Sequence, residues 1–238
     1  MPSAGRPDGK TEMRILALDT TTGSGSVALL EDTRLLAEIN AASPSTHSSR
    51  LLRSVDYLLK RNSLEIQEID GFAVAAGPGS FTGIRIGLST IKAFAFASRK
   101  SVAPVSSLAA LAMKLQETQG RLFCPMIDAK KGEVFAALFE LQGRSLKAVI
   151  KEGAYGPDAL LARLPAHRVI HFIGTGVEVY KEKILAYLKD KARLSSRSLF
   201  IGFEVGLIGD EILRKGKGVS AEALEPLYYR KSQAEDKK

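Results

Sequence analysis

Several features are scarce in this chain of 238 residues. It has one cysteine, Cys124, which cannot form an internal disulfide and is typical of a reducing cytosol, so we expect a cytoplasmic location. No apolar run approaches the ~20 residues of a membrane-spanning helix, so no membrane contact is expected. Residues 1–12 carry proline, glycine and charges without an apolar core, which predicts a disordered extension rather than a secretory signal.

Groups that could bind a metal or act as a nucleophile are also few. His167 and His171 have the i, i+4 spacing of a helical zinc site, but they flank a predicted strand, on which four residues span roughly 13 Å. His47 has no second ligand nearby in the sequence. Cys124 lies in an apolar strand, where a thiol is normally inert, and the chain has no Gly-x-Ser-x-Gly elbow. We therefore predict no metal site, no cofactor and no covalent catalysis.

The positive charge of the chain is uneven. The formal net charge is +8, and residues 143–200 hold 11 Lys+Arg against 5 Asp+Glu, a net charge of +6. Such a basic region can bind an anionic partner such as RNA, or it can be a solvated face that keeps the protein soluble, which is the commoner case. No RNA-binding motif with interleaved aromatic residues is present, so both interpretations stay open.

One pattern occurs twice, about half the chain apart. Residues 15–31 form an apolar strand that ends in Asp19, a turn of Thr, Gly and Ser, and a second apolar strand, and residues 125–138 repeat this plan around Asp128. A repeat of this size fixes the architecture and predicts two lobes with one hairpin each. Two such turns facing each other across a cleft suit a phosphate chain. The two carboxylates could position a metal–phosphate group or cap their own turns, and the sequence leaves both open.

The remaining elements alternate between strands and helices, which predicts an α/β sheet with helices on its faces. Beyond the hairpins at 14–30 and 124–141 we expect strands at 35–39, 72–76, 102–105 and 169–173. We expect helices from residue 44 to 60 and at 84–98, 107–115, 159–164, 180–188 and 201–213. The helix at 84–98 is apolar nearly all round, which predicts burial on every side.

These elements divide into two lobes. We expect a first lobe at 13–115, a second at 116–230 and a frayed tail at 231–238, and the last helix could return to the first lobe.

A glycine-rich segment, residues 77–87 (GPGSFTGIRIG), follows a buried strand and opens a helix. Glycines allow close backbone approach, and free N–H groups at a helix start can bind an anion. It is not a Walker loop, because no Lys-Ser/Thr follows Gly83. The alternative is a tight strand-to-helix turn with no ligand. The GSGSVA run at 23–28 matches a dinucleotide pattern only weakly, since a strand rather than a helix follows it.

Five motifs in order resemble the TsaB (YeaZ) family, and the resemblance runs from Met13 to about Glu235. The motifs are Arg14–Thr20, Gly77–Gly87, Ile127–Val134, Gly174–Gly176 and Glu225–Arg230. The resemblance implies the actin-like, sugar-kinase and Hsp70 ATPase superfold, which is RNase H-like.

The resemblance also implies a role. Such a protein would be a non-catalytic scaffold subunit of the bacterial complex that forms N6-threonylcarbamoyladenosine in tRNAs reading codons that begin with A. It would pair with and activate the catalytic subunit TsaD, support the ATPase TsaE, meet tRNA through the complex, and be able to self-associate as a homodimer.

The family resemblance places a degenerate nucleotide site between the lobes. Active ATPases of the superfold usually have glycine soon after each strand-end Asp, whereas here three threonines follow Asp19 and Ala-Lys-Lys follows Asp128. Side chains there would hinder the approach of the backbone to phosphate. We therefore expect no enzyme activity, with weak nucleotide binding left open. The candidate residues are Asp19, Thr22, Ser24, Gly77, Gly79, Ser80, Asp128, Gly174 and Gly176.

The competing hypothesis is a genuine ATP-dependent phosphotransferase that uses Asp19 and Asp128. A metallopeptidase is nearly excluded, because the sequence offers no plausible metal site.

The resemblance also implies that helices of the first lobe contact TsaD. Two helices from each partner would form a four-helix contact, buried like a domain core. The helices at 45–60 and 84–98 fit this role, and the alternative is that both simply pack on their own sheet. The expected contact residues are His47, Leu51, Val55, Leu58, Arg85, Leu88, Ile91 and Ala95.

Overall fold

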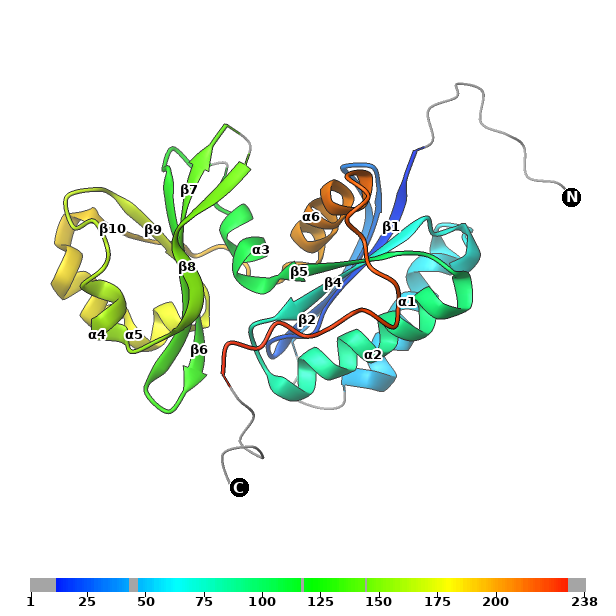
Figure 1. Ribbon diagram of the computed structural model, residues 1–238, viewed down its shortest axis with the longest axis horizontal. Coiled ribbons are helices and arrows are strands. Elements are labelled where there is room, and N and C mark those ends of the chain that lie inside the picture. The colour runs from blue at the N-terminus through cyan, green and yellow to red at the C-terminus, as the bar shows by residue number, and fades with distance from the viewer. Residues whose placement is uncertain (1–11, 43–46, 117, 144, 231–238) are drawn as a thin grey trace, which may run out of the picture.

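The computed structural model describes residues 12–42, 47–116, 118–143 and 145–230. Two lobes lie side by side, each built on a five-stranded mixed sheet with helices on its faces (Figure 1). The α/β architecture expected from the duplicated hairpins is confirmed. No helix within the described ranges is long and apolar enough to cross a membrane.

The first sheet begins with an antiparallel meander of β1 (Arg14–Asp19), β2 (Ser24–Glu31) and β3 (Arg34–Ala42). β4 (Gly71–Gly77) and β5 (Val102–Ser106) add parallel strands, so the order is β3-β2-β1-β4-β5. Every residue of β4 is buried, as its wholly apolar sequence predicts for a strand covered on both faces. The ends of β1 and β4 meet at one edge, where the polar turns follow.

Helices cover both faces of this first sheet. α1 (His47–Arg61) and α2 (Phe81–Ser98) pack on one face, and a short 3₁₀ helix, η1 (Ile66–Glu68), precedes β4. α3 (Ser107–Met113) and α6 (Gly202–Arg214) pack on the other. α6 comes from the far end of the sequence, so the chain crosses back to the first lobe after completing the second.

The second sheet repeats the first. Its strands are β6 (Leu122–Lys130), β7 (Glu133–Gln142), β8 (Ser145–Tyr155), β9 (Ile170–Ile173) and β10 (Ala192–Leu194), in the order β10-β9-β6-β7-β8. α4 (Pro157–Leu161), α5 (Thr175–Leu188) and a 3₁₀ helix, η2 (Lys189–Lys191), complete the lobe. Each strand therefore has a counterpart in the first lobe, β6 matching β1 and β9 matching β4.

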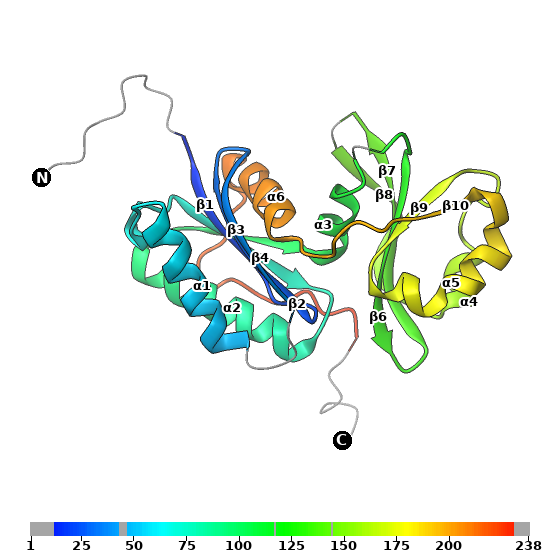
Figure 2. The same cartoon turned by 180° about the vertical axis from the view of Figure 1, so that it is seen from behind.

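One hydrophobic cluster spans both lobes, beside a separate cluster within each lobe. α3 and α6 lie between the two sheets, as Figure 2 shows from behind. Apolar side chains of both sheets join the buried side chains of these helices, including Leu108, Leu111 and Val205, in a single cluster with Phe123 and Phe139 of the second sheet. The core thus extends across the boundary between the lobes, and the lobes do not depend on a single linker for their arrangement.

The structure differs from the expected elements in several respects. β8 and β10 were not predicted. α2 and α5 begin at Phe81 and Thr175, earlier than expected, so the polar turns lead directly into them. The expectation that the 84–98 helix is buried on every side is wrong, because Phe96 on its outer face is 72% exposed. The expected start of the first helix at 44–46 and the tail at 231–238 lie outside the described residues.

Candidate functional site

A cavity of about 790 Å³ opens between the lobes. The turns of both hairpins, the starts of α2 and α5 and the last described residues of the chain form its walls. Four predicted nucleotide-site residues line it, namely Thr22, Gly79, Ser80 and Asp128. The walls also carry a group of apolar and aromatic side chains, among them Phe81, Ile84, Ile127, Phe135, Val179 and Tyr228.

Asp19 closes β1 and is completely buried beside this cavity. Its Oδ1 atom accepts hydrogen bonds from the backbone N–H of Thr21 at 2.8 Å and from the Thr21 hydroxyl at 2.7 Å. Its Oδ2 atom has no hydrogen-bond partner among the described residues. Burial raises the pKa of Asp19 to about 6, although the hydrogen bonds from Thr21 act in the opposite direction. The carboxylate therefore binds groups of its own hairpin turn.

Asp128 is the counterpart of Asp19 in the second lobe, and a cation neutralises it. Its Oδ1 atom accepts the backbone N–H of Lys130 at 2.9 Å, and its Oδ2 atom accepts Lys130 Nζ at 2.7 Å. Partial burial raises the pKa of Asp128, but the hydrogen bonds and charge of Lys130 outweigh it and hold that pKa below its usual value. Both carboxylates are thus engaged within their own turns.

The glycine-rich segment presses the start of α2 against the turn that follows β1. The backbone N–H of Ser80 donates to the carbonyl of Thr21 at 2.6 Å, and the Thr20 hydroxyl donates to the carbonyl of Gly83 at 2.7 Å. A Cβ atom on Gly83 would lie 1.9 Å from the Thr20 carbonyl oxygen, and one on Gly79 2.3 Å from that of Thr21. This geometry favours a tightly packed turn over an anion-binding loop.

The second lobe uses glycine in the same way at the end of β9. Gly174 has φ +117°, and a Cβ atom there would lie 2.2 Å from the carbonyl oxygen of Met126. A Cβ atom on Gly176 would lie 3.2 Å from Met126. Gly77, at the end of β4, is the counterpart of Gly174 and has φ +123°. These three predicted site residues are buried packing positions that do not line the main cavity, and the side chain of Ser24 lies outside the described part.

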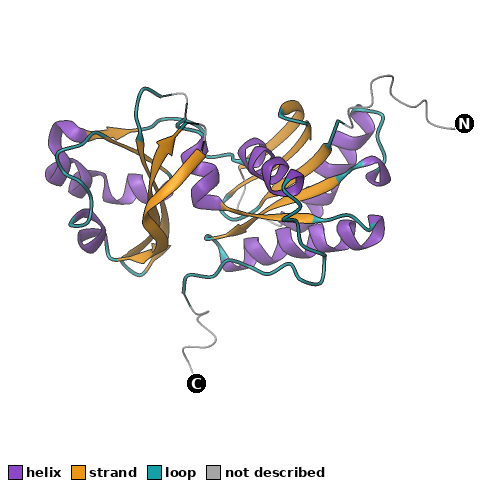
Figure 3. Cartoon of the chain, turned by 45° about the horizontal axis from the view of Figure 1, so that its top comes forward, coloured by secondary structure: helices purple, strands orange, loops and turns teal. Residues whose placement is uncertain are grey.

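Residues 225–230, here named the strap, run from the first lobe towards the second (Figures 1 and 3). The last four of them line the cavity. The Leu227 N–H donates to the carbonyl of Ala76 at 2.8 Å. The Tyr228 ring stacks on the Phe81 ring with 5.3 Å between ring centroids. The Arg85 guanidinium lies over the Phe81 ring, 3.8 Å from its centroid. These contacts fix the first half of the strap to β4 and α2.

The second half of the strap is bound to the second lobe. Tyr229 Oη donates to Glu152 on β8 at 2.9 Å, and Arg230 pairs with Glu133 on β7 at 3.1 Å. Glu152 also accepts the hydroxyl of Ser106, at the end of β5, at 2.6 Å. In the sequence the strap stands out only as a family motif, and its bridging role could not be predicted because Glu152 lies on β8, which was not predicted.

No group of three His, Cys, Asp or Glu side chains able to hold a metal ion occurs within 12–42, 47–116, 118–143 and 145–230. His171 packs its ring edge against Phe123, at 6.2 Å between centroids, and burial followed by the charge of Arg193 lowers its pKa. Cys124 is buried in β6, and burial raises the pKa of its thiol, which disfavours the reactive thiolate.

Comparison with known proteins identifies the family. Residues 39–236 match the family described as TsaD: tRNA N6-adenosine threonylcarbamoyltransferase. The chain is 31% identical to the tRNA threonylcarbamoyladenosine biosynthesis protein TsaB of Haemophilus influenzae, over 92% of this chain and 94% of that one. The chain belongs to the TsaB (YeaZ) family. The TsaB of Bacillus subtilis is 29% identical over 94% of this chain and 97% of that one.

Solved structures agree with this assignment. YeaZ from Pseudomonas aeruginosa is 31% identical, with a TM-score of 0.80 over 91% of this chain and 99% of that one. The activator of 2-hydroxyisocaproyl-CoA dehydratase from Clostridium difficile, with bound ADPNP, has a TM-score of 0.50 at 11% identity over 91% of this chain and all of that one. That likeness shows the fold alone. The predicted family and the predicted actin-like superfold are confirmed.

In this TsaB-family chain, six of the eight expected contact residues lie inside the first lobe. Their exposed fractions are 0–5%, and they pack with β-strand side chains in the core beneath α1 and α2. This corrects the expected direct contact, because these side chains hold the helices to their own sheet. The six are Leu51, Val55, Leu58, Leu88, Ile91 and Ala95. Arg85 is exposed beside the strap, and the side chain of His47 lies outside the described part.

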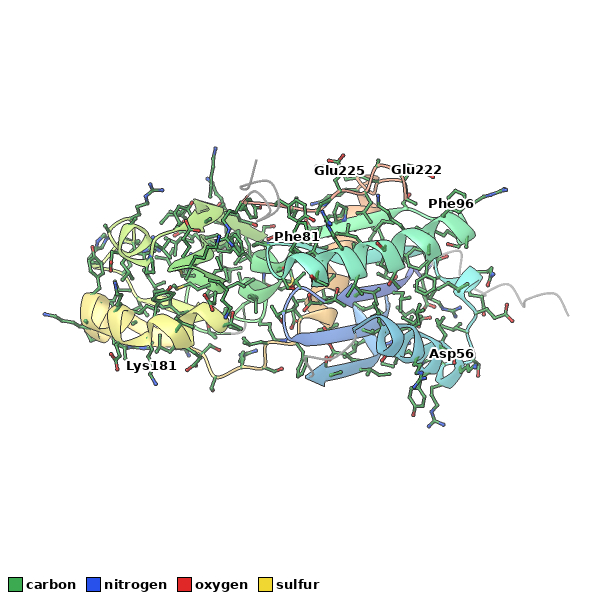
Figure 4. The ribbon with its side chains drawn as sticks, turned by 90° about the horizontal axis from the view of Figure 1, so that it is seen from below. Asp56, Phe81, Phe96, Lys181, Glu222 and Glu225 are labelled. Carbon is green, nitrogen blue, oxygen red and sulfur yellow. The ribbon has the colours of Figure 1, made fainter. Side chains whose placement is uncertain are left out.

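Other side chains of the same two helices do reach the surface. Leu52 and Tyr57 on α1 and Phe96 on α2 are exposed, as are Ala93 and Ala97 on the outer side of α2. Figure 4 shows Phe81 and Phe96 at opposite ends of α2, with the outer side of the helix between them. The sequence pattern marked the apolar positions that face the core, and the residues available to a partner lie between them.

Proposed function

We propose that this chain is a non-catalytic scaffold subunit of the bacterial machinery that forms N6-threonylcarbamoyladenosine in tRNAs reading codons that begin with A. It pairs with TsaD and activates it, and the assembled pair supports the ATPase TsaE in the cytoplasm. The observation that carries the non-catalytic part is that Asp19 and Asp128 are both bound within their own turns. Family membership carries the pathway.

The lack of catalysis follows from the chemistry of phosphoryl transfer. That reaction depends on charge stabilisation of the phosphates, in which a metal ion held by carboxylates takes part. Here Lys130 neutralises Asp128, and Asp19 lies buried under Thr20 and Thr21 with a pKa of about 6. Asp19 does not line the cavity, and Asp128, which does, is held by Lys130, so neither carboxylate is presented as a free metal ligand.

Pairing with TsaD uses the outer side of α2 and the adjacent part of α1. Exposed Ala93 and Ala97 allow another helix to approach closely, and Phe96 and Leu52 add apolar area at the edges. Two helices from each partner then form a four-helix contact. Without TsaD the same surface pairs with a second copy of this chain, because the residues that suit a helix pair also suit a symmetric dimer.

Measurement of ATP turnover tests the non-catalytic role. The isolated chain should show no turnover above background, and Asp19→Asn and Asp128→Asn should leave tRNA modification unchanged when TsaD and TsaE are present. Asparagine keeps the shape of each side chain, so these substitutions should disturb folding less than alanine would. The cavity between two phosphate-loop-like turns favours one alternative, an ATP-dependent phosphotransferase. ATP turnover that both substitutions abolish would establish that alternative instead.

A matched pair of substitutions tests the pairing surface. Ala93→Arg places a charge in the middle of the outer side of α2, and Ala186→Arg places the same charge on the exposed side of α5 in the second lobe. Co-purification with tagged TsaD should be lost in the first variant and kept in the second, while the thermal unfolding of both stays near that of the unmodified chain. Retention of TsaD by both variants would refute the proposed surface.

A further inference from the structure

One edge of the second lobe gathers positive charge. Six cations, here named the cationic edge, lie on the elements where β6, β9 and β10 begin and on the segment that follows β10. They are Arg121, Arg168, Lys189, Lys191, Arg193 and Arg197. β9 and β10 lie side by side in the outer part of this lobe, away from α1 and α2 (Figure 1).

Strand register brings these residues together. Leu122, Ile170 and Ala192 are direct neighbours across β6, β9 and β10, so Arg121 and Lys191, one residue earlier, lie about two strand spacings apart, roughly 10 Å. The segment after β10 continues along the same strands, because the Ser195 N–H donates to the carbonyl of Phe172 at 2.9 Å. The cations of β10 and of the segment after it therefore run along the outer edge of the sheet, and Arg121 and Arg168 lie at the strand starts.

Carboxylates pair with two of these cations. Glu140 pairs with Arg168 at 2.9 Å and Asp190 with Lys191 at 2.8 Å. The Arg193 guanidinium donates to the backbone carbonyls of Asp190, at 2.7 Å, and Ala192, at 3.1 Å. Carbonyl oxygens fix its position without cancelling its charge. Five of the 11 Lys and Arg residues of the 143–200 region belong to the cationic edge.

We propose that the cationic edge binds the phosphate backbone of tRNA. The inference rests on the proposed function, which makes tRNA the substrate of the machinery that this chain serves. Exposed Arg and Lys side chains with hydroxyls nearby are the groups that contact phosphates in nucleic-acid complexes. Ser196 and Ser198 are exposed on the segment that carries Arg197. The edge presents charge without a large apolar centre, which distinguishes it from a protein-docking surface.

The binding is expected to be independent of sequence. Phosphate contacts position an RNA and release counterions, so affinity falls as salt rises, with a slope set by the number of phosphates neutralised. The sequence showed no RNA-binding motif with interleaved aromatic residues, and such a motif is not needed for contacts of this kind. The edge would orient tRNA on the assembly while another subunit carries out the chemistry.

Two double variants with the same charge change test the proposal. Arg121→Glu/Lys189→Glu reverses two cations of the edge, and Arg99→Glu/Lys217→Glu reverses two exposed cations of the first lobe. Each pair contains one Arg, one Lys and one residue in the left-handed region, since Lys189 has φ +49° and Arg99 φ +55°. The change in net charge is identical in the two variants, and the thermal unfolding of each shows whether it folds.

The measurement is fluorescence anisotropy of a labelled, unmodified tRNA transcript titrated with the isolated full chain between 50 and 200 mM KCl. The edge variant should bind more than tenfold more weakly than the unmodified chain and lower the salt slope by about 1.5, since two phosphate contacts are lost. The first-lobe variant should bind within twofold of the unmodified chain. Equal weakening by both variants would show an effect of net charge alone and overturn the proposal, as would tRNA binding that neither variant changes.

Two further outcomes separate this inference from its alternatives. Binding of polyglutamate but not of tRNA, lost in the edge variant, would assign the edge to an acidic protein and overturn the RNA proposal. Co-purification of the edge variant with TsaD should stay unchanged. Failure of the unmodified chain to retain TsaD would contradict the proposed function, whereas tRNA binding by the isolated chain does not depend on that result.

Discussion

Tyr229 and Glu152, 77 residues apart, form a hydrogen bond of 2.9 Å that ties the strap to the second lobe. The same carboxylate accepts the hydroxyl of Ser106 from the first lobe at 2.6 Å. Glu152 is therefore a junction of three segments that are far apart in sequence, and it lies beside the cavity that the strap borders. The width of the cavity depends on this junction as well as on the shared core.

Removal of the Tyr229 hydroxyl should weaken the junction. A hydrogen bond to a charged acceptor contributes about 1.5–3 kcal/mol, and partial exposure reduces this, so Tyr229→Phe should lower the free energy of unfolding by about 1 kcal/mol. Urea denaturation measures this value. Tyr187→Phe, which removes an exposed hydroxyl on α5, is the control and should change stability little. Equal effects of both substitutions would mean that the junction contributes nothing specific.

The unmodified chain and Tyr229→Phe should also differ in how their stability depends on pH. Burial, then the charge and hydrogen bond of Glu152, raises the pKa of Tyr229 above its usual value near 10. As pH rises through 10 the phenol ionises in the unfolded state while it stays neutral in the folded state, so the unmodified chain loses stability. Tyr229→Phe lacks this group, and its stability should fall less between pH 9.5 and 10.5. Parallel curves for the two proteins would contradict the assigned cause.

Asp19 should make the protein less stable as pH rises from 4 to 6. Its folded pKa of about 6 lies above the ordinary value of 3.8, so only the unfolded state ionises in this window. The difference corresponds to about 3 kcal/mol, which is lost by pH 7. Asp19→Asn keeps the acceptor for Thr21 and removes the titration. Its urea midpoint should therefore stay flat from pH 4 to 7, relative to the falling midpoint of the unmodified chain, and a parallel fall in both would disprove the buried titration.

Gly83, in the segment at 77–87, should tolerate substitution by alanine less well than Gly23 in the first hairpin turn. A Cβ atom on Gly83 would lie 1.9 Å from a carbonyl oxygen, whereas one on Gly23 would meet nothing within 4 Å. Gly83→Ala must move α2 away from the turn and should cost more than 2 kcal/mol, in the range of overpacked core sites. Gly23→Ala is the control and should change the unfolding free energy by less than about 0.5 kcal/mol. Near-equal stabilities would contradict the packing role.

The sequence predicts best those elements whose residue pattern has a single structural explanation. β1 and β6 are apolar strands that end in Asp, and their repetition predicted two lobes before the register was known. β8 was missed because Lys147, Lys151 and Glu152 interrupt its apolar residues, so that no clear strand pattern stands out. Its place as the third strand of the second meander, matching β3, was the available signal.

The candidate site was harder to predict than the fold. Four of the nine predicted residues line the cavity, and whether Asp128 is free depends on the geometry of Lys130, which only coordinates provide. Apolar periodicity in α1 and α2 marked Leu51 and Ile91, which face the sheet, and could not reveal that Phe96 is exposed. A hydrophobic pattern predicts that one face of a helix is buried. The structure is needed to show whether the sheet or a partner covers that face.

Removing only one partner of the ion pair between Lys114 and Glu204 should destabilise the fold. Lys114 Nζ lies 2.9 Å from Glu204 Oε1, between the two sheets, and Glu204 Oε2 has no hydrogen-bond partner among the described residues. Burial raises the pKa of Glu204 in spite of the opposing effect of Lys114. Lys114→Met leaves a largely buried carboxylate unpaired and should lower the free energy of unfolding by about 3 kcal/mol at pH 7.

The double variant Lys114→Met/Glu204→Met should recover most of that loss, because two apolar side chains of similar volume can replace a buried ion pair. Lys215→Met, which breaks the exposed pair with Glu211, is the control and should change stability by less than about 1 kcal/mol. Urea denaturation at pH 7 and pH 5 compares all three. A Lys114→Met protein as stable as the control would mean that Glu204 is already neutral at pH 7, and the loss should then be absent at both pH values.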